Sequence, residues 1–309
     1  MTSLESLKPG EDPDRPVHVV FVGAGAVGCF YASRLHHPSH NIHVSLIARS
    51  NYKALAESGV HLQTRTFGDY VFRPHAVFPS VAAAAVGPQS SGAGPREWDY
   101  IIVTTKALPD RSDDSALIAP LVGPSSCIVL IQNGVGVEQP YRARFPTTPI
   151  VSAVTVISAE QTSPGTAIRW HKLCINAAFN PAAVLSGGRG NADMARDAEL
   201  RRHLAAVMDE IWAAAPRVLG RRAFPPPGAA GPDRILASTE RNVGARPSML
   251  LDWDAGRPME LEVILGNPLR IARARGVEMP RLQTVYALLR SMQEVRDGQR
   301  KKKKREGKL

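Results

Sequence analysis

The sequence predicts an α/β fold in which a domain built on a parallel sheet precedes an all-helical domain. An apolar, β-branched run at residues 17–22 ends in a glycine-rich turn, and a helical pattern follows the turn. Strand-like and helix-like segments then alternate to about residue 157, which favours a parallel sheet with helices on both faces. From about residue 169 the apolar residues recur with helical spacing only.

The glycine-rich turn has the G-x-G-x-x-G spacing of a dinucleotide-binding loop. It consists of Gly23, Ala24, Gly25, Ala26, Val27 and Gly28. In such a loop the first glycine permits a sharp turn, the second lets a pyrophosphate approach the backbone, and the third lets the helix pack close to the strand. The N-terminus of that helix offers free N–H groups to phosphates. We therefore expect a Rossmann-type domain whose loop residues bind a dinucleotide.

The remaining elements are expected in a regular order. In the first domain we expect strands at 41–49, 99–105, 127–131 and 150–157, helices at 50–57, 112–122 and 138–144, a hairpin within 60–78 that turns at 67–69, and a mobile loop at 87–95. In the second domain we expect helices at 170–185, 193–219, 232–243, 257–275 and 281–296, with a Pro-rich linker at 222–228.

These elements define the expected domains. We expect a disordered lead-in at residues 1–16, a dinucleotide-binding domain at 17–168, a helical substrate domain at 169–297 and a basic tail at 298–309. Ligands of open parallel sheets bind at the carboxyl ends of the strands. The sequence therefore predicts a ligand cleft between the two domains.

Composition narrows the function classes. The 309 residues include three scattered cysteines, Cys29, Cys127 and Cys174, which lack metal-ligand spacing and are expected as buried thiols in a reducing, cytoplasmic compartment. No apolar run approaches the roughly 20 residues that span a bilayer. We expect no bound metal and no membrane contact.

The basic tail accounts for much of the net charge of +10. Residues 300–309 carry seven basic side chains and one acidic one. We expect a solvated tail, with a nuclear-import signal, an anionic-surface contact or a weak peroxisomal address as alternatives. Nucleic-acid binding is not expected, because no aromatic residues alternate with the lysines.

Two cations indicate the cofactor. Arg49 follows the second strand at the position where an acidic residue would bind the ribose hydroxyl of NAD, and no carboxylate lies beside it. An arginine there matches the geometry of the 2′-phosphate of NADP. Lys106, at the end of a later strand, could add a second charge beside that phosphate. The pattern favours NADP(H), although both side chains could instead be ordinary surface cations.

A helix in the second half carries the candidate chemistry. Lys172, Asn176 and Asn180 recur at spacing i, i+4 and i+8, so one helix face presents an ammonium and two amides. Glu260 lies two residues after Pro258, which suits the first turn of a helix, and it could pair with Lys172. A solvated helix face and an ordinary helix N-terminal acid are the alternative interpretations. By residue type alone, Ser248 and Asn133 are weaker candidates.

These residues together resemble the ketopantoate reductases (2-dehydropantoate 2-reductases). The resemblance runs from about residue 17 to 289 and rests on several short motifs: the glycine loop, Arg49, Thr105-Lys106-Ala107, Gln132-Asn133-Gly134, Trp170-x-Lys172 with Asn176 and Asn180-Pro181, Ser248-Met249-Leu250-x-Asp252, and Glu260 ahead of Gly266. No single motif is specific, but the combination is.

The resemblance implies an activity and a set of roles. It implies reduction of the 2-keto group of ketopantoate by NADPH, a step in pantothenate biosynthesis. Lys172 would be the general acid that protonates the forming alkoxide, and Glu260 would hold either that lysine or the substrate hydroxyl. The resemblance implies substrate contacts for Asn176, Asn180, Ser248 and Asn133, and Asn133 would also contact the nicotinamide side of the cofactor.

The sequence departs from the family before Trp170. In the family, several dozen residues with further strands separate the strand that corresponds to 150–157 from the Trp-x-Lys helix, whereas here Ser163-Pro164-Gly165 leads almost directly to Trp170. We therefore expect a truncated sheet with an unpaired edge. A lost or mis-joined exon, a homodimer that covers the edge, and a degenerate relative that binds NADP(H) as a sensor or partner-binding protein are the open explanations.

Overall fold

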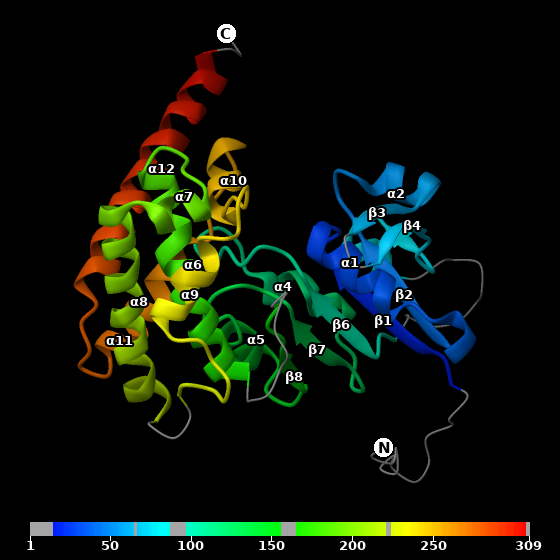
Figure 1. Cartoon of the computed structure of the whole chain (residues 1–309). Helices are drawn as coiled ribbons and strands as arrows, with labels where there is room; N and C mark the ends of the chain where they lie inside the picture. The colour runs from blue at the N-terminus through cyan, green and yellow to red at the C-terminus, as the bar shows by residue number, and fades with distance from the viewer. Residues whose placement is uncertain (1–14, 65–66, 87–96, 156–164, 221–223, 307–309) are drawn as a thin grey trace. The chain divides into compact units, whose positions relative to one another are not determined.

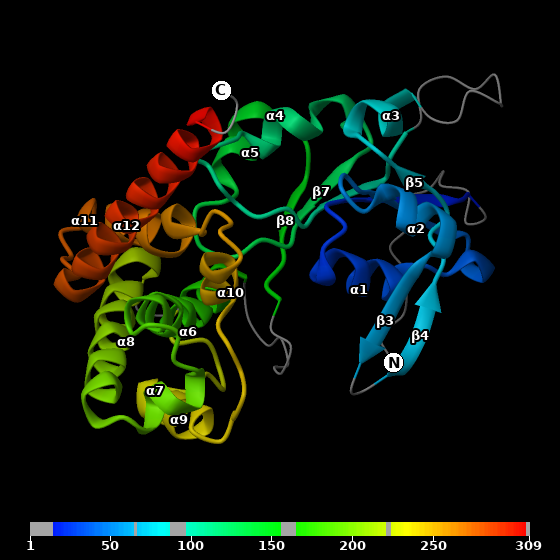
Figure 2. The same ribbon diagram turned by 90° about the horizontal axis from the view of Figure 1, so that it is seen from above.

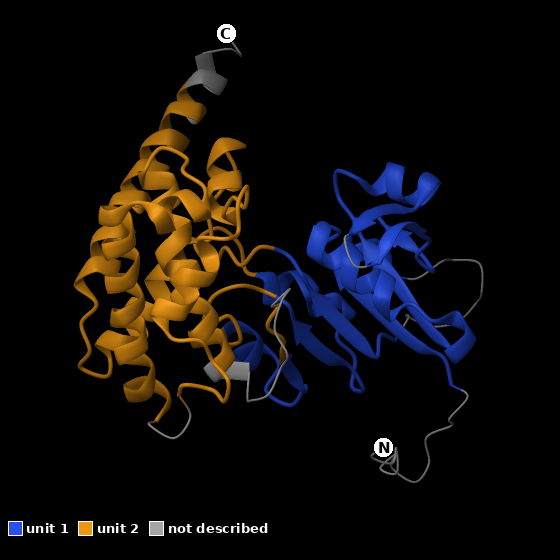
Figure 3. Ribbon diagram, in the orientation of Figure 1, with its two compact units in different colours: residues 1–105, 114–131, 140–151 blue, residues 106–113, 132–139, 152–309 orange. Residues whose placement is uncertain are grey.

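The computed structural model describes residues 15–64, 67–86, 97–155, 165–220 and 224–306, and the chain forms two compact units (Figure 3). Unit 1 comprises residues 1–105, 114–131 and 140–151, and unit 2 comprises residues 106–113, 132–139 and 152–309. Two short segments that follow strands of unit 1 thus belong to unit 2, so no single boundary after residue 168 separates the units. Most of the expected lead-in (1–14) and the expected loop at 87–95 lie outside the described residues.

Unit 1 is built on the expected parallel sheet. Its order is β5-β2-β1-β6-β7-β8, and β1 pairs in parallel with β2 and β6. The strands span Val17–Val22 (β1), Ile42–Ile47 (β2), Val77–Phe78 (β5), Tyr100–Val103 (β6), Cys127–Leu130 (β7) and Ile150–Ser152 (β8) (Figure 1). Phe21, Leu46 and Ile102 are buried in its core. The predicted α/β class is confirmed.

The hairpin of unit 1 is shorter than expected. Strands β3 (Val60–Thr64) and β4 (Gly68–Phe72) form a separate two-stranded antiparallel sheet (Figure 2). The prediction that the hairpin continues to residue 78 was wrong, because β5 joins the main sheet, where Val77 pairs with Leu46. Pro74 lies between β4 and β5, and a proline cannot donate to a strand ladder, so it ends the hairpin.

Five helices of the described chain belong wholly or largely to unit 1. They span Ala26–Leu35 (α1), Tyr52–Ser58 (α2), Val81–Val86 (α3), Asp114–Ile118 (α4) and Gln139–Arg144 (α5). Helix α3 was not predicted, since its run of alanines and valines has no helical periodicity. The expected helix at 112–122 is divided into α4 and a 3₁₀ turn at Ala119–Leu121, where Pro120 interrupts the α-helical ladder.

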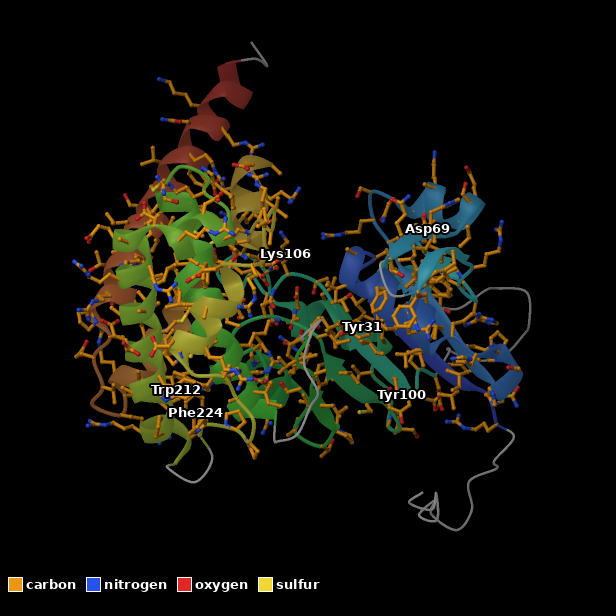
Figure 4. All side chains as sticks on the ribbon, viewed as in Figure 1. Tyr31, Asp69, Tyr100, Lys106, Trp212 and Phe224 are labelled. Carbon is orange, nitrogen blue, oxygen red and sulfur yellow. The ribbon has the colours of Figure 1, made fainter. Side chains whose placement is uncertain are left out.

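Unit 2 is helical, as predicted. Its helices span Gly165–Leu185 (α6), Asn191–Arg196 (α7), Ala198–Leu219 (α8), Pro232–Thr239 (α9), Ser248–Asp254 (α10), Asn267–Arg273 (α11) and Pro280–Glu306 (α12). Helix α6 packs against α8, α10 and α12 (Figures 1 and 2). Trp212 of α8 contacts Phe224 edge to face, with ring centroids 4.9 Å apart (Figure 4).

Several helix boundaries in unit 2 differ from the predictions: α6 begins at Gly165 rather than at residue 170, and α9 ends at Thr239 rather than at residue 243. The expected helix at 193–219 is broken at Asp197, whose carboxylate accepts hydrogen bonds from the backbone N–H groups of Glu199 and Leu200 and so caps α8. Residues 257–260 are not helical, and a π-helix at Glu262–Gly266 leads into α11. Helix α12 continues to Glu306, so the basic segment from residue 298 is helical up to that point rather than an irregular tail.

Strand β8 is the last strand in the order of the sheet. It has three residues, fewer than the expected strand at 150–157, and Val151 is 49% exposed. Residues 156–164 lie outside the described residues, so the end of the expected strand at 150–157 and most of the junction before Trp170 are not tested. Within the described residues no helix has both the length and the apolar character needed to cross a membrane.

Candidate functional site

The turn between β1 and α1 contains three glycines. The fold requires glycine at two of these positions but not at the third. Gly23 has φ +113°, and a Cβ on Gly28 would lie 2.2 Å from the carbonyl oxygen of Gly23, so both positions require glycine for the turn itself. Gly25 has an ordinary extended backbone (φ −84°, ψ −178°), and a Cβ there would meet no atom of the described residues within 4 Å. The open face at Gly25 fits a phosphate group that must approach the backbone closely.

Arg49 follows β2 in the same unit. The side chain of Asn51 donates a 3.0 Å hydrogen bond to the carbonyl oxygen of Ala24, which ties the loop that carries Arg49 to the glycine turn. Arg49 is exposed, and among the described residues no hydrogen bond or ion pair engages its guanidinium. The side chain is therefore available to an anionic ligand at this edge of the sheet.

Lys106, which is labelled in Figure 4, is the first residue of unit 2 in the chain. Its Nζ atom forms an ion pair with the carboxylate of Asp252, which is 5% exposed and also accepts a 3.0 Å hydrogen bond from Nε of Arg257. We expected Lys106 and Arg49 to lie beside the same phosphate. The two residues belong to different units, so this expectation stays a prediction.

The turn after β7 presents Asn133 within unit 2. Gly134 has φ +85°, and a Cβ on it would lie 2.3 Å from the carbonyl oxygen of Val263. The backbone N–H of Val135 donates a 3.0 Å hydrogen bond to the same carbonyl. The turn is therefore fixed against the π-helix, and the glycine is required for that close approach.

A chain of hydrogen bonds joins Lys172 to Glu260 through Asn133. Nζ of Lys172 donates to Oδ1 of Asn133 at 2.9 Å, and Nδ2 of Asn133 donates to Oε2 of Glu260 at 3.1 Å. The backbone N–H of Ala107 donates to Oε1 of the same carboxylate at 3.2 Å. Glu260 thus occupies the irregular segment before the π-helix rather than the expected helical turn, and its link to Lys172 passes through Asn133.

The charges and burial around Lys172 and Glu260 favour proton transfer near neutral pH. Burial, reinforced by the nearby charge of Arg169 and opposed by Glu260, lowers the pKa of Lys172 to about 8. Burial also raises the pKa of Glu260, although the hydrogen bonds from Asn133 and Ala107 and the charge of Lys106 oppose that shift. A lysine with a pKa near the working pH is suited to act as a general acid.

The predicted substrate contacts fall into two groups. Asn133 and Asn176 line a small pocket together with Lys172 and five further residues: Gln132, Gly134, Val154, Arg169 and Leu173. Asn180 is 4% exposed, and its Oδ1 atom accepts hydrogen bonds from Oγ of Ser248 at 3.3 Å and from the backbone N–H of Met249 at 3.0 Å. The structure therefore joins Asn180 and Ser248 to each other at the start of α10, apart from the residues that line this pocket.

Sequence reasoning missed Arg169, which lines the same pocket. It precedes Lys172 by three residues on α6, so helical spacing places the two side chains on one face, and this spacing was the available signal. Within the described residues no cluster of His, Cys, Asp and Glu could hold a metal ion.

Comparison with known proteins assigns the family. The model for ketopantoate reductase PanE/ApbA matches residues 19–173, and the model for the C-terminal part of the same family matches residues 166–293. The chain therefore belongs to the ketopantoate reductase family, whose named members are oxidoreductases.

Individual relatives agree with this assignment. The chain is 29% identical to the uncharacterized protein YDL144C of Saccharomyces cerevisiae, over 88% of this chain and 92% of the relative. It is 23% identical to a 2-dehydropantoate 2-reductase of Nostoc, over 87% of this chain and 93% of the relative. The solved 2-dehydropantoate 2-reductase from Methylococcus capsulatus superimposes with a TM-score of 0.74 at 30% identity, covering 91% of this chain and 98% of that one.

Proposed function

We propose that this chain reduces the 2-keto group of ketopantoate, or of a closely related 2-keto acid, to a 2-hydroxy group with NADPH. The observation that carries the proposal is the position of Lys172, a mostly buried ammonium with a pKa of about 8 that lines a pocket and is held by Asn133. Membership in the ketopantoate reductase family supports the reaction class.

The residues of unit 1 fit a phosphorylated dinucleotide. The loop from Gly23 to Gly28 would hold the pyrophosphate, and the open space at Gly25 is where a phosphate would approach the backbone. Arg49 would take the 2′-phosphate of NADP. Lys106, which belongs to unit 2, would offer the cofactor a further positive charge if it exchanged its partner Asp252 for a phosphate. When bound, the reduced nicotinamide supplies the hydride.

Lys172 supplies the proton in this proposal. As the carbonyl carbon of the keto acid gains a hydride, negative charge develops on the carbonyl oxygen, and the ammonium of Lys172 stabilises that charge and then donates a proton to it. The lysine, left neutral, regains a proton from solvent. General acid catalysis of this kind contributes roughly 10²- to 10⁴-fold to a rate.

The other side chains would orient Lys172 and the substrate. Asn133 and Glu260 would hold the ammonium in place, and Asn176, on the same pocket wall, would donate to an oxygen of the keto acid. Since Asn180 caps the start of α10, we propose that it acts by positioning Ser248 for the substrate carboxylate.

The edge strand β8 bears on assembly. Strand β8 ends the sheet order with three residues and a half-exposed Val151, which supports an edge that a second copy of the chain would cover. Sedimentation of the purified chain tests this proposal: a dimer is expected, and a monomer at micromolar concentration would contradict it.

An NADPH-oxidation screen tests the function. Purified protein is incubated with NADPH and either ketopantoate, other branched 2-keto acids or pyruvate, and absorbance is followed at the nicotinamide band. Turnover with a 2-keto acid supports the proposal, and product analysis identifies the 2-hydroxy acid. Calorimetric binding of NADPH without turnover of any 2-keto acid would instead identify a non-catalytic NADP(H)-binding protein.

A further inference from the structure

Arg169 is almost fully buried near the start of α6. Its side chain is 3% exposed, and its Nε atom donates to Oγ of Ser152 at 2.6 Å and lies 3.1 Å from Oε1 of Glu138. A buried guanidinium requires such acceptors, because leaving the charge unpaired would be strongly destabilising. Glu138 provides the compensating charge, and burial nevertheless lowers the pKa of Arg169.

The terminal nitrogens of Arg169 bind the backbone on both sides of Asn133. One of them donates to the carbonyl oxygen of Gln132 at 2.6 Å and to that of Gly134 at 3.1 Å, and the other donates to the carbonyl oxygen of Ala153 at 3.3 Å. The planar guanidinium presents five N–H groups in a fixed arrangement, so it fixes the positions of these carbonyl oxygens relative to one another. A lysine could not reproduce that arrangement.

Arg169 and Lys172 thus hold the same residue in two ways. Arg169 binds the peptide carbonyls that flank Asn133, and Lys172, three residues later on α6, binds its side-chain oxygen. The turn is also fixed from its other side by the hydrogen bond from Val135 to Val263. The orientation of the Asn133 amide is therefore set by its backbone as well as by its partners.

Arg169 also acts on Lys172 through charge. After burial, the positive charge of Arg169 is the next largest influence that lowers the pKa of Lys172, and Glu260 opposes it. Glu138 offsets part of the charge of Arg169, while Lys106 and Asp252 act on Glu260 with opposite signs. Removing Arg169 or removing Glu138 should therefore move the pKa of Lys172 in opposite directions.

We propose that Arg169 is a positioning residue for this reaction. It fixes the turn at residues 132–134 so that Asn133 orients Lys172, and it places a positive charge near that lysine. The inference rests on the proposed function insofar as the step that Arg169 serves belongs to Lys172. A clamp that served only the fold would hold the same carbonyls but would not set the protonation of Lys172.

Two readouts distinguish positioning from a purely structural role. The first is the pH at which Lys172 becomes half-reactive toward acetic anhydride, which is measured by mass spectrometry and needs no turnover. The second is kcat for 2-keto-acid reduction. In Arg169→Met the half-reactive pH should rise by about one unit, since a nearby positive charge is lost, and kcat should fall about 100-fold as the turn moves. In Arg169→Lys the charge remains, so kcat should fall with little change in the half-reactive pH.

Glu138→Gln is the matched variant of opposite sign. It keeps an acceptor beside Ser152 but removes the negative charge, so the half-reactive pH of Lys172 should fall below the wild-type value. This variant decides the matter if Arg169→Met does not fold. Unchanged half-reactive pH values in the variants that fold would overturn the proposal and leave Arg169 a clamp of the fold.

The test separates this inference from the proposed function. If the wild-type chain reduces no 2-keto acid, the proposed function fails, and the part of the inference that concerns Lys172 protonation is still decided by the labelling experiment. If the wild-type chain is active and Arg169→Met keeps both kcat and the half-reactive pH, the inference fails alone.

Discussion

Nζ of Lys172 donates a 2.9 Å hydrogen bond to Oδ1 of Asn133, and this amide is the only described group that joins the lysine to the buried carboxylate of Glu260 by direct hydrogen bonds. Because the amide accepts on one side and donates on the other, its orientation is fixed. Glu260 can therefore influence Lys172 without forming an ion pair that would hold the ammonium away from a substrate oxygen.

Replacing Asn133 should alter the acid without removing it. In Asn133→Asp a carboxylate would face the ammonium directly, so the pKa of Lys172 should rise from about 8 and the alkaline limb of the pH–rate profile should move to higher pH. In Asn133→Ala the ammonium would lose a hydrogen bond to its charged form, and the limb should move to lower pH. Profiles of kcat/KM against pH measure both shifts, and limbs that coincide with the wild type would contradict the bridging role.

The wild-type enzyme should lose activity as the pH rises. Lys172 must carry its proton to act as the general acid, so kcat/KM should fall about tenfold per pH unit above about pH 8. A profile that is flat between pH 7 and pH 10 at saturating NADPH would show that the group that titrates at pH 8 is not required for turnover.

Because its pKa is lowered in the folded chain, Lys172 should decrease the free energy of unfolding at neutral pH. Its pKa is about 8 in the folded chain and near 10.5 in the unfolded chain, so the unfolded state binds more protons between these values and wild-type stability should rise with pH across this window. Lys172→Met should therefore be more stable than the wild type by about 1–3 kcal/mol below pH 8, with the difference vanishing near pH 10.5.

Urea unfolding at several pH values measures this difference. Lys53→Met, at an exposed position of α2, is the control and should change the free energy of unfolding by less than about 0.5 kcal/mol. A Lys172→Met variant that is less stable than the wild type at pH 7 would contradict the assigned penalty.

The glycine turn offers a matched pair of substitutions. Gly25→Ala should leave the fold intact, because its Cβ meets no described atom, but should weaken NADPH binding at least tenfold by blocking a phosphate. Gly28→Ala would place a Cβ 2.2 Å from the carbonyl oxygen of Gly23 and should destabilise unit 1 itself. Calorimetry and thermal unfolding separate the two effects. Wild-type affinity in Gly25→Ala would place the cofactor elsewhere.

Arg49 should set the choice between NADPH and NADH. Arg49→Glu replaces a phosphate-binding cation with a carboxylate that suits a ribose hydroxyl, so the Kd for NADPH should rise at least tenfold while that for NADH falls. Arg142→Glu, an exposed change of equal charge on α5, is the control and should alter neither Kd appreciably. If the two substitutions weakened NADPH binding equally, Arg49 would act only through the net charge of the protein and not by binding the 2′-phosphate.

The fold was predictable where one local pattern decided it. The β-branched run before Gly23 and the spacing of Lys172, Asn176 and Asn180 each predict one element, and the structure contains both. The hairpin boundary was not predictable in this way, since Val77-Phe78 could extend β4 or join β2, and only packing in the main sheet selects the second arrangement. At Asp197 the local signal was present: aspartate is a typical helix N-cap, yet the long helical pattern around it predicted one continuous helix.

The site was only partly predictable for the same reason. Helical spacing brought Lys172 and Asn176 to one pocket wall, but it could not show that Asn180 caps α10 or that Asn133 stands between Lys172 and Glu260. Those contacts join residues that are 39 to 127 positions apart in the chain, and a single sequence carries no signal for such pairings.

The role of Lys172 as general acid is tested by comparing the reduction of ketopantoate by NADPH between the wild type and Lys172→Ala. We expect turnover by the wild-type chain and a loss of roughly 10²- to 10⁴-fold in kcat for the variant, with NADPH affinity and the unfolding midpoint retained. Equal kcat values for the two proteins, or no turnover of any 2-keto acid by a folded wild-type chain that binds NADPH, would contradict it.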